Sequence, residues 1–343
     1  MSTSFSTIQN LGAKGLLSKV QQYDAFKHAS VHQSIGDDAA VLVKNDESFQ
    51  LISSDIFVEG VDFDLVYTPL QHLGYKIVSS AVSDIYAMNG TPETLLVNLA
   101  LPNRVSVEMI TDLYEGIFSA GKEFEVELVG GDLKANHQHL VLSVTVTGSV
   151  SKPDIVYRKT ANQGDALCVT GDLGAALAGL RILMREKSVW EQSNEQELAQ
   201  PDLSGYEFVV KRQLVPQARK DIIEAFREHS VVPTSMIDIT KGLLQEVTSI
   251  CEASHTGAYL YQAALPIAIE TRQVADEMEE DVDRYALFGG EDLELLFTLP
   301  ESEVERLAGK LQDFSVVGRL VPQEEGLAMQ TAEGEIVDFD ELS

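Results

Sequence analysis

The sequence predicts an α/β protein of the α+β type, with mixed sheets, in two domains. Segments that alternate apolar and polar residues, as strands do, are interleaved with segments of helical periodicity, and this order is typical of sheets covered by helices. The chain has 343 residues, more than one domain usually contains, and its 44% hydrophobic content is enough for sizeable cores. The cluster "SKPD" at residues 151–154 interrupts the strands. It separates an N-terminal domain, residues 1–150, from a C-terminal α/β domain, residues 151–343.

The elements expected in the first domain are three half-buried strands and two helices. Around Val144, apolar side chains fall on one face, and Ser143 and Thr145 fall on the other. Thr68 is expected to cap the first helix and Pro69 to occupy its first position, where a proline loses no hydrogen bond. The strands are expected at residues 95–102, 125–132 and 140–150, and the helices at residues 69–88 and 105–124.

The second domain is expected to begin with a strand and a helix that are joined by the turn "GDLG". Residues 191–205 are rich in Gln and Glu and are expected to form an exposed connection. The glycine-rich stretch "LFGGEDLELLFTLP" leads into a later strand. The other ranges are a strand at residues 166–170 and helices at residues 175–186, 211–229 and about 240–254.

The charge of the chain makes one class of partner unexpected. With 25 Lys and Arg against 54 Asp and Glu, the formal charge is −29, so we expect no basic surface for nucleic acid. Any bound phosphate would need another source of positive charge, and a divalent metal ion suits an acidic chain.

The N-terminal residues contain neither a basic start nor an apolar core segment. No window holds about 18 uninterrupted apolar residues, so we expect a cytoplasmic protein without a membrane partner. Cys168 and Cys251 lie in apolar patterns without a CxxC motif and are expected to be buried free thiols. The chain contains no P-loop, HExxH or GxSxG motif, which leaves the carboxylates as the candidate functional groups.

Five aspartates lie next to apolar strands or on an inward helix face. Asp38 precedes "AAVLV", Asp55 follows "LISS", Asp132 ends "VELVGGD" and Asp238 follows "TSMI". Asp84 falls on the apolar stripe of its helix. A buried carboxylate needs a positive partner, and the first hundred residues contain only five lysines, none beside these aspartates. Bound cations are therefore expected.

The type of ligand indicates the type of ion. Carboxylates without Cys or His favour hard cations, and Mg²⁺ ranks above Ca²⁺ or Mn²⁺ where phosphates complete the coordination shell. The alternative is a structural role for each aspartate. Asp37 and Asp38 would then form Asx turns, Asp132 would follow a glycine turn, and Asp238 would belong to a helix start at Ser235.

Seven ordered segments carry a resemblance to a known family. They are "SIGDDAAVL", "SSDIFVEGVDFD", "AVSDIYAMNGTP", "LVGGD", "YRKTANQGD", "SMIDITKGL" and "FGGEDLELLFT". Their order and spacing, from about residue 30 to residue 320, resemble the thiamine-monophosphate kinases, which share a superfamily with aminoimidazole ribonucleotide synthetase. The resemblance implies a homodimer in which N-terminal metal- and nucleotide-binding domains join their sheets. It also implies that ATP binds in a cleft between the two domains with several Mg²⁺ ions.

The resemblance also implies roles for individual residues. The catalytic aspartates would be Asp84, Asp132 and Asp238. The metal ligands would be Asp38, Ser53, Ser54, Asp55, Asp84, Asp132 and Asp238, with Asp37 as a turn former. The ATP contacts would be Tyr114, Gly131, Asp132, Arg158, Thr240 and Lys241. The substrate-side residues would be Asp62, Glu291 and Phe339, although incidental packing is an alternative for Phe339.

The implied reaction is the phosphorylation of thiamine monophosphate by ATP, which gives thiamine diphosphate and ADP by direct, Mg²⁺-assisted in-line transfer. The nucleophile is a phosphate oxygen that is mostly anionic at neutral pH, since its second pKa is about 6. No general base is required. The barrier comes from bringing two anions together, and metal ions held by aspartates offset that repulsion.

Two positions depart from the family pattern. Asp62 stands where many members have a substrate-contacting histidine, and Lys241 in "DITKG" takes the second acidic position of the usual Asp-Ile-Ser-Asp-Gly. We expect Lys241 to replace one metal ion and to contact phosphate directly; a solvated surface lysine is the alternative. The departures leave open a non-catalytic relative that binds nucleotide or thiamine phosphate. Another ATP-dependent synthetase, such as one that makes selenophosphate, would need a reactive cysteine before Cys168, and none is present.

Overall fold

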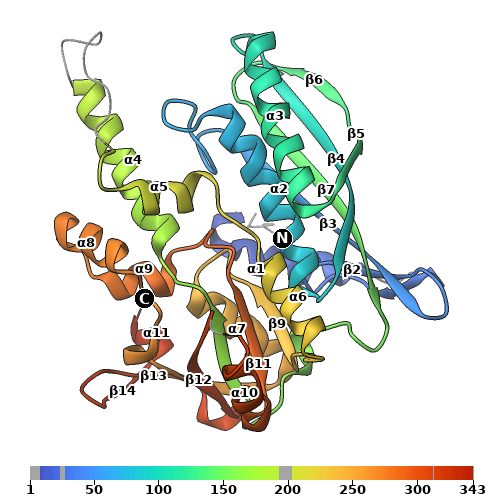
Figure 1. Ribbon diagram of the computed structural model, residues 1–343, viewed down its shortest axis with the longest axis vertical. Coiled ribbons are helices and arrows are strands. Elements are labelled where there is room, and N and C mark those ends of the chain that lie inside the picture. The colour runs from blue at the N-terminus through green and yellow to red at the C-terminus, as the bar shows by residue number, and fades with distance from the viewer. Residues whose placement is uncertain (1–7, 24–27, 193–202, 312, 343) are drawn as a thin grey trace, which may run out of the picture.

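The computed structural model describes residues 8–23, 28–192, 203–311 and 313–342. Within these ranges the chain forms two mixed seven-stranded sheets that follow one another along the sequence (Figure 1). The predicted α/β architecture with mixed sheets is confirmed. The last strand of the first sheet ends at Ser151, and the first strand of the second sheet begins at Ala166.

The first sheet has the order β1-β2-β3-β7-β4-β5, and β6 also pairs with β4. Neighbouring long strands are antiparallel, whereas β5 and β6 run parallel to β4. Strand β7 shows the predicted alternation, with Val144 buried and Thr145 on the opposite face. The strands are β1 (Val31–Gln33), β2 (Ala40–Val43), β3 (Ser48–Val58), β4 (Thr91–Pro102), β5 (Glu127–Gly130), β6 (Leu133–Asn136) and β7 (Val141–Ser151).

Two helices, α2 (Leu70–Ala87) and α3 (Val107–Phe124), lie against one face of this sheet (Figure 1). They pack closely because glycines meet backbone where they cross. A Cβ atom on Gly74 would lie 2.0 Å from the Leu113 carbonyl oxygen, and one on Gly116 would lie 1.9 Å from that of Gln71. This contact fixes α2, which supplies residues to the candidate site. A further helix, α1 (Ile8–Gln21), precedes the sheet.

The other face of the first sheet exposes apolar side chains. Ile56 of β3 is 64% exposed and Leu96 of β4 is 41% exposed. Between them, the Ser54 hydroxyl lies 3.0 Å from that of Thr145. The helices that cover the first sheet therefore leave this outer face open.

The second sheet has the order β14-β13-β10-β12-β8-β11-β9, and only β10 and β13 pair in parallel. Strand β8 matches its predicted range of residues 166–170. The strands are β8 (Ala166–Thr170), β9 (Ser235–Asp238), β10 (Thr256–Tyr261), β11 (Leu295–Leu299), β12 (Phe314–Pro322), β13 (Leu327–Gln330) and β14 (Ile336–Asp338). The remaining helices are α4 (Ala175–Gln192), α5 (Glu207–Leu214), α6 (Lys220–Glu228), α7 (Leu243–Ser254), α8 (Ile269–Met278), α9 (Val282–Phe288), α10 (Glu301–Ala308) and α11 (Phe339–Leu342).

Both faces of the second sheet are buried at β9 and β11. Leu296 of β11 packs with the core around α7, whereas its neighbour Phe297 belongs to the same hydrophobic cluster as the first sheet and α2. The Phe297 ring lies 5.2 Å from that of Phe226 in α6. A single apolar core therefore runs from the first sheet through α2 to the second sheet. The assignment of residues 1–150 and 151–343 to separate domains stays a prediction.

Several element boundaries differ from the expected ones for local reasons. Pro69 takes the N-cap position of α2, so the helix begins one residue later than expected and Thr68 lies outside it. The helix expected over residues 211–229 is two helices, because Pro216 cannot donate a backbone hydrogen bond and restricts Val215. Gly242, with φ of 100°, precedes α7, which therefore begins at Leu243.

The other differences concern α4 and the connection after it. Helix α4 continues to Gln192, beyond its expected end. Of the connection expected at residues 191–205, positions 193–202 lie outside the described residues.

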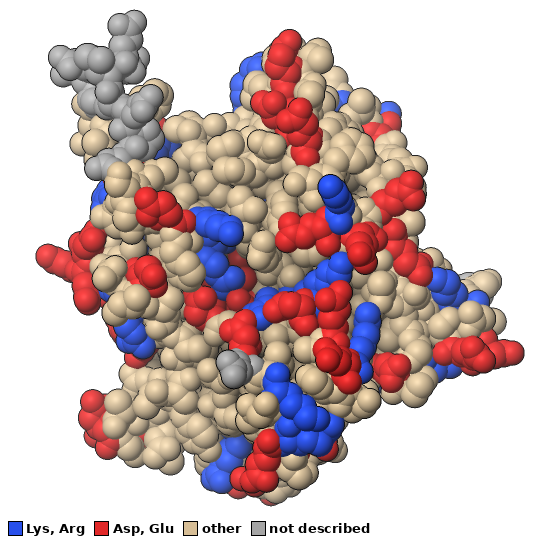
Figure 2. Space-filling view, in the orientation of Figure 1, with Lys and Arg blue, Asp and Glu red and all other residues tan. Residues whose placement is uncertain are grey.

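The burial of the cysteines, the character of the helices and the charge of the surface bear on three expectations from the sequence. Cys168 and Cys251 are buried free thiols, as predicted. In the described part of the chain, no helix has both the length and the apolar character that a membrane crossing requires. Figure 2 shows acidic and basic side chains intermingled over one face of the molecule.

Candidate active site

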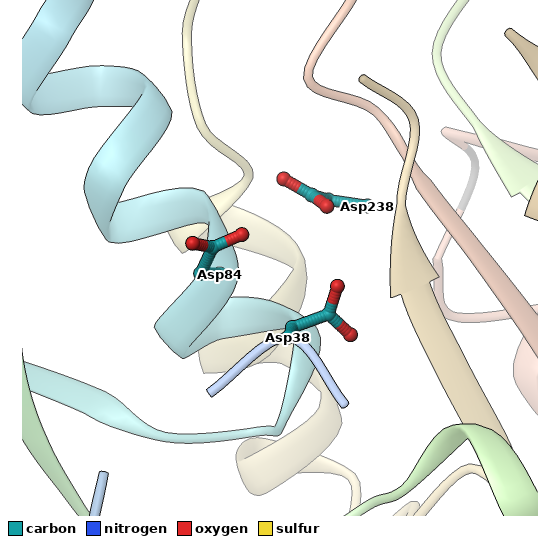
Figure 3. Close-up of side chains that lie close together, drawn as sticks. All are labelled: Asp38, Asp84 and Asp238. Atoms are coloured by element: carbon teal, nitrogen blue, oxygen red, sulfur yellow. The ribbon is translucent and has the colours of Figure 1, made fainter. Parts of the chain in front are cut away.

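Three aspartates from distant parts of the sequence meet at one point. Asp38 lies just before β2, Asp84 lies near the end of α2, and Asp238 is the last residue of β9. One carboxylate oxygen from each lies within 4.8 Å of the others, and the three side chains point toward one another (Figure 3). Three hard oxygen ligands at this spacing fit a divalent cation.

Asp238 shows most clearly that the cluster needs a positive partner. Its side chain belongs to a strand that is buried along its whole length, and the residue is 2% exposed. Its Oδ2 atom has no hydrogen-bond partner among the residues that the structure describes. A buried carboxylate oxygen without a partner is costly, and a bound cation would satisfy it.

Strand β3 adds two more oxygen-bearing side chains. Ser53 and Asp55 lie on the face that α2 covers, and the Ser53 hydroxyl donates to Asp84 Oδ2. Asp55 lies within β3, not at the strand end that the sequence suggested. Ser54 points to the opposite face, where it contacts Thr145. The structure therefore brings Ser53 and Asp55 to the cluster and turns Ser54 away from it.

Asp38 already has a positive partner, which the sequence analysis did not expect. The guanidinium of Arg158 contacts both Asp38 oxygens, and Arg158 Nε donates to Oδ2 at 3.1 Å. Arg158 lies beyond the first hundred residues, in the part of the chain that follows the first sheet (residues 151–343, the second half; residues 1–150 are the first half). Asp37 accepts the Asp38 backbone N–H at 3.2 Å and Gln33 Nε2 at 2.8 Å, which agrees with its expected role in the turn.

Burial and mutual repulsion raise the pKa values of this cluster. For Asp84, burial is the largest cause, followed by the negative charges of Asp238, Asp55 and Asp38, and its pKa lies well above the ordinary value. Burial likewise raises the pKa of Asp238 well above normal, with Asp38 as the next cause. Burial raises the pKa of Asp55 to about 6. The cluster therefore resists holding all its negative charges without a cation.

Lys241 lies close enough to act on this cluster electrostatically. Its charge opposes the rise in the pKa of both Asp38 and Asp55. Its backbone N–H donates to Glu246 Oε1 at 3.1 Å, which ties the segment before α7 to that helix. Lys241 therefore acts on the cluster from the second half of the chain, as Arg158 does.

A cavity of about 640 Å³ is lined in part by Thr240, which lies two residues after Asp238. It lies between the loop of residues 60–67, helix α4 and the "GGED" turn. Across it, Lys187 Nζ contacts Asp64 at 2.6 Å. The polar side chains that line it include Asp62, Asp64, Tyr67, Lys187, Thr240 and Glu291. The structure thus brings the predicted Asp62, Thr240 and Glu291 to one cavity.

The segment after the "GGED" glycines contains two buried acidic residues whose partners were not expected from the sequence. Asp292 is fully buried and accepts backbone N–H groups of Gly174 at 2.7 Å and Ala176 at 3.0 Å, so it caps α4. Glu294 accepts from Arg212 at 2.8 Å and from Arg219 at 2.5 Å. The available signal was a run of acidic residues beside a buried strand, where carboxylates need partners.

Four predicted residues lie outside this group. Asp132 is not one of the three clustered aspartates; its side chain is 64% exposed and lies 3.6 Å from Lys134. Gly131 comes so close to β4 that a Cβ atom would lie 1.7 Å from the Val97 carbonyl oxygen. Tyr114 lies on α3 beside Phe118. Their proposed roles stay predictions.

The fourth is Phe339, at the start of α11. It is buried in the core around α7 and is not among the residues that line the cavity. This placement agrees with the packing alternative for Phe339.

The family model for the AIR synthase related protein, N-terminal domain, matches residues 36–150. Over 281 residues the chain is 32% identical to the thiamine-monophosphate kinase of Bacillus subtilis, a match that covers 82% of this chain and 81% of that protein. The chain belongs to the thiamine-monophosphate kinase family. The thiamine-monophosphate kinase of Aquifex aeolicus is 31% identical over 294 residues, with 86% of this chain and 88% of that protein covered.

Solved structures of thiamine-monophosphate kinases share the architecture. A structure described as AaThiL complexed with AMPPCP and TMP superposes with a TM-score of 0.82 at 28% identity, over 98% of this chain and 97% of that one. The family resemblance carried by the seven sequence segments is thereby confirmed.

The raised pKa of Asp84 predicts how stability without metal depends on pH. A carboxyl whose pKa is higher in the folded state stabilises that state fully below its unfolded pKa of about 4, and this contribution is lost as the pH rises through the folded value. In EDTA, Asp84→Asn should therefore have a Tm close to that of the parent at pH 4. At pH 8 its Tm should be about 3 °C or more higher.

The matched control is Asp46→Asn, because Asp46 is exposed in the turn between β2 and β3. Its Tm should follow that of the parent at every pH. If Asp84→Asn showed no increase in Tm at pH 8, the charge of Asp84 would not destabilise the metal-free protein.

Proposed function

We propose that the protein transfers the terminal phosphate of ATP to thiamine monophosphate, giving thiamine diphosphate and ADP. The observation that carries the proposal is the meeting of Asp38, Asp84 and Asp238 at one point. Thr240, two residues after Asp238, lines a cavity together with the carboxylates of Asp62 and Glu291. Family membership supports the choice of substrates, since a related structure is described as a complex with AMPPCP and TMP.

The residues fit Mg²⁺ ions that would accompany ATP. Asp38, Asp84 and Asp238 would hold metal with help from Asp55 and Ser53, and the unpartnered oxygen of Asp238 supports this assignment. When bound, such ions neutralise and align the phosphate groups. The chain's own contribution is to keep these carboxylates in place on a buried helix and a buried strand. Asp132 would complete the set, as the family pattern implies.

Two cationic side chains would contact phosphate directly. Arg158 is held at Asp38 by a forked contact, and Lys241 acts on Asp38 and Asp55. A guanidinium and an ammonium at this place suit the negative charge of phosphate oxygens. The thiazolium ring of the acceptor is cationic, and the carboxylates of Asp62 and Glu291 in the cavity suit it. The acceptor phosphate is already anionic, so no side chain is needed to remove a proton.

The first prediction tests the reaction itself. Incubation with ATP, Mg²⁺ and thiamine monophosphate should yield thiamine diphosphate, measured by chromatography. Asp84→Asn and Asp238→Asn should each lower kcat/KM by at least about 100-fold, because each removes one charge from the metal-binding cluster. Asp46→Asn serves as the control and should retain the parent's rate. Absence of turnover with retained ATP binding would instead favour the non-catalytic relative.

The second prediction concerns Lys241, which we propose takes the place of one metal ion. Lys241→Ala should weaken ATP binding, measured by calorimetry, because a positive charge beside the phosphates is lost. Lys241→Asp changes the local charge by two units and should make the rate depend more steeply on Mg²⁺ concentration. If both variants match the parent in ATP affinity and Mg²⁺ dependence, Lys241 is a solvated surface lysine.

We also propose that the protein is a homodimer formed through the outer face of the first sheet. Exposed Ile56 and Leu96 lie on this face beside the Ser54 and Thr145 hydroxyls. This arrangement suits contact with the same face of a second copy, related by a two-fold rotation. Ile56→Glu should convert the dimer to a monomer in sedimentation experiments. Val61→Glu, at an 81% exposed loop position, is the matched control and should leave the mass unchanged. A parent protein that sediments as a monomer would overturn this proposal.

A further inference from the structure

Lys76 is a buried lysine on α2 that has none of the roles described above. The residue is 4% exposed, although it belongs to the residue type that is least often buried without a function or a partner. It comes from the first half of the chain, and both of its partners come from the second half. Its position on the helix that also carries Asp84 places it at the substrate end of the candidate site.

The Lys76 ammonium has three acceptors for its three hydrogens. It donates to Glu291 Oε2 at 2.8 Å and to the backbone carbonyl of Gln213 at 3.2 Å. The Gln213 amide is best oriented with its oxygen toward Lys76, also at 3.2 Å, because its nitrogen then donates to the Ala176 carbonyl at 3.0 Å. An ammonium has no further donor. Lys76 is therefore occupied by protein groups and is not available to bind phosphate.

Glu291 is the partner that faces the cavity. It lies in the "GGED" turn with φ of 66°, a backbone conformation that fixes the direction of its side chain. Its side chain is 36% exposed, compared with 5% for Lys76. One carboxylate oxygen is held by Lys76, and the side chain lines the cavity together with Asp62 and Thr240. Lys76 thus holds one oxygen of the Glu291 carboxylate from the buried side. The other oxygen can contact a ligand in the cavity.

We infer that Lys76 is a positioning residue for the phosphate acceptor: its buried ammonium orients Glu291 toward the cationic ring of thiamine monophosphate. This inference rests on the proposed function. Holding one oxygen of a carboxylate at a fixed point reduces the number of its rotamers, and a small misplacement of such a group has large effects on binding. The same contact ties α2 to the "GGED" turn.

The test compares the kinetics of Lys76→Met, Lys76→Arg, Glu291→Gln and the Lys76→Met/Glu291→Gln double variant. Lys76→Met should raise KM for thiamine monophosphate by at least about tenfold while KM for ATP stays within about twofold, because only the acceptor end loses its anchor. Lys76→Arg should raise KM for thiamine monophosphate less than Lys76→Met does. In the Glu291→Gln background, Lys76→Met should have little further effect, since the group that it positions is already altered.

Lys220→Met is the matched control. Lys220 also joins the two halves of the chain, through Glu125 at 3.3 Å and the Glu123 carbonyl, but neither of these partners lines the cavity, whereas Glu291 does. Its kinetic constants should match those of the parent. If Lys220→Met and Lys76→Met caused equal losses, the effect would come from general loosening between the halves, and the positioning role would be wrong.

The remaining outcomes separate this inference from the proposed function. If the parent turns over thiamine monophosphate but the Lys76 variants leave the KM for it unchanged, only the inference is overturned. The same holds if the changes in KM caused by Lys76→Met and Glu291→Gln multiply in the double variant. If the parent shows no turnover, the proposed function and the inference both fall. Should Lys76→Met not fold, Lys76→Arg and Glu291→Gln carry the test, and an unchanged KM for thiamine monophosphate in both would overturn the inference.

Discussion

Helix α2 lies between the first sheet on one side and β9 and α5 on the other, and the rest of the site depends on this burial. A polar side chain buried on such a helix is costly unless it finds a hydrogen-bond partner. Ser79 accepts the Ala218 backbone N–H at 2.9 Å, and Lys76 contacts Glu291. Each of these partners comes from the second half of the chain. These two contacts join α2 to the second half of the chain.

The charges of the site are divided between the two halves of the chain in a consistent way. The first half contributes most of the carboxylates, including Asp38, Asp55 and Asp84. The second half contributes the cations that oppose them, Arg158 and Lys241. Neither half alone would therefore have a balanced site. A strongly acidic chain can bind anionic ligands in this way, because a few basic side chains and metal ions are concentrated where phosphate must lie.

Much of the site could be predicted from the sequence because it depends on local patterns. Asp84 was identified by its place on the apolar stripe of α2, and Asp38 and Asp238 by the strands beside them. What could not be predicted were the contacts between distant segments. Arg158 at Asp38, Lys76 at Glu291 and Asp292 at the start of α4 have no signature in spacing, since each depends on how the sheets are stacked. The split at Pro216 is a different case, because the rule for the residue before a proline can be read from the sequence and outweighs the helical periodicity.

The apolar core that passes without a break from the first sheet, through α2, to Phe297 in the second sheet has a consequence for folding. Two domains with separate cores can open independently, and each then has its own free energy of unfolding. A shared core removes that option, because exposing one half would strip the other of its buried surface. Separating the two halves would therefore expose apolar side chains of both to water, which opposes such an opening.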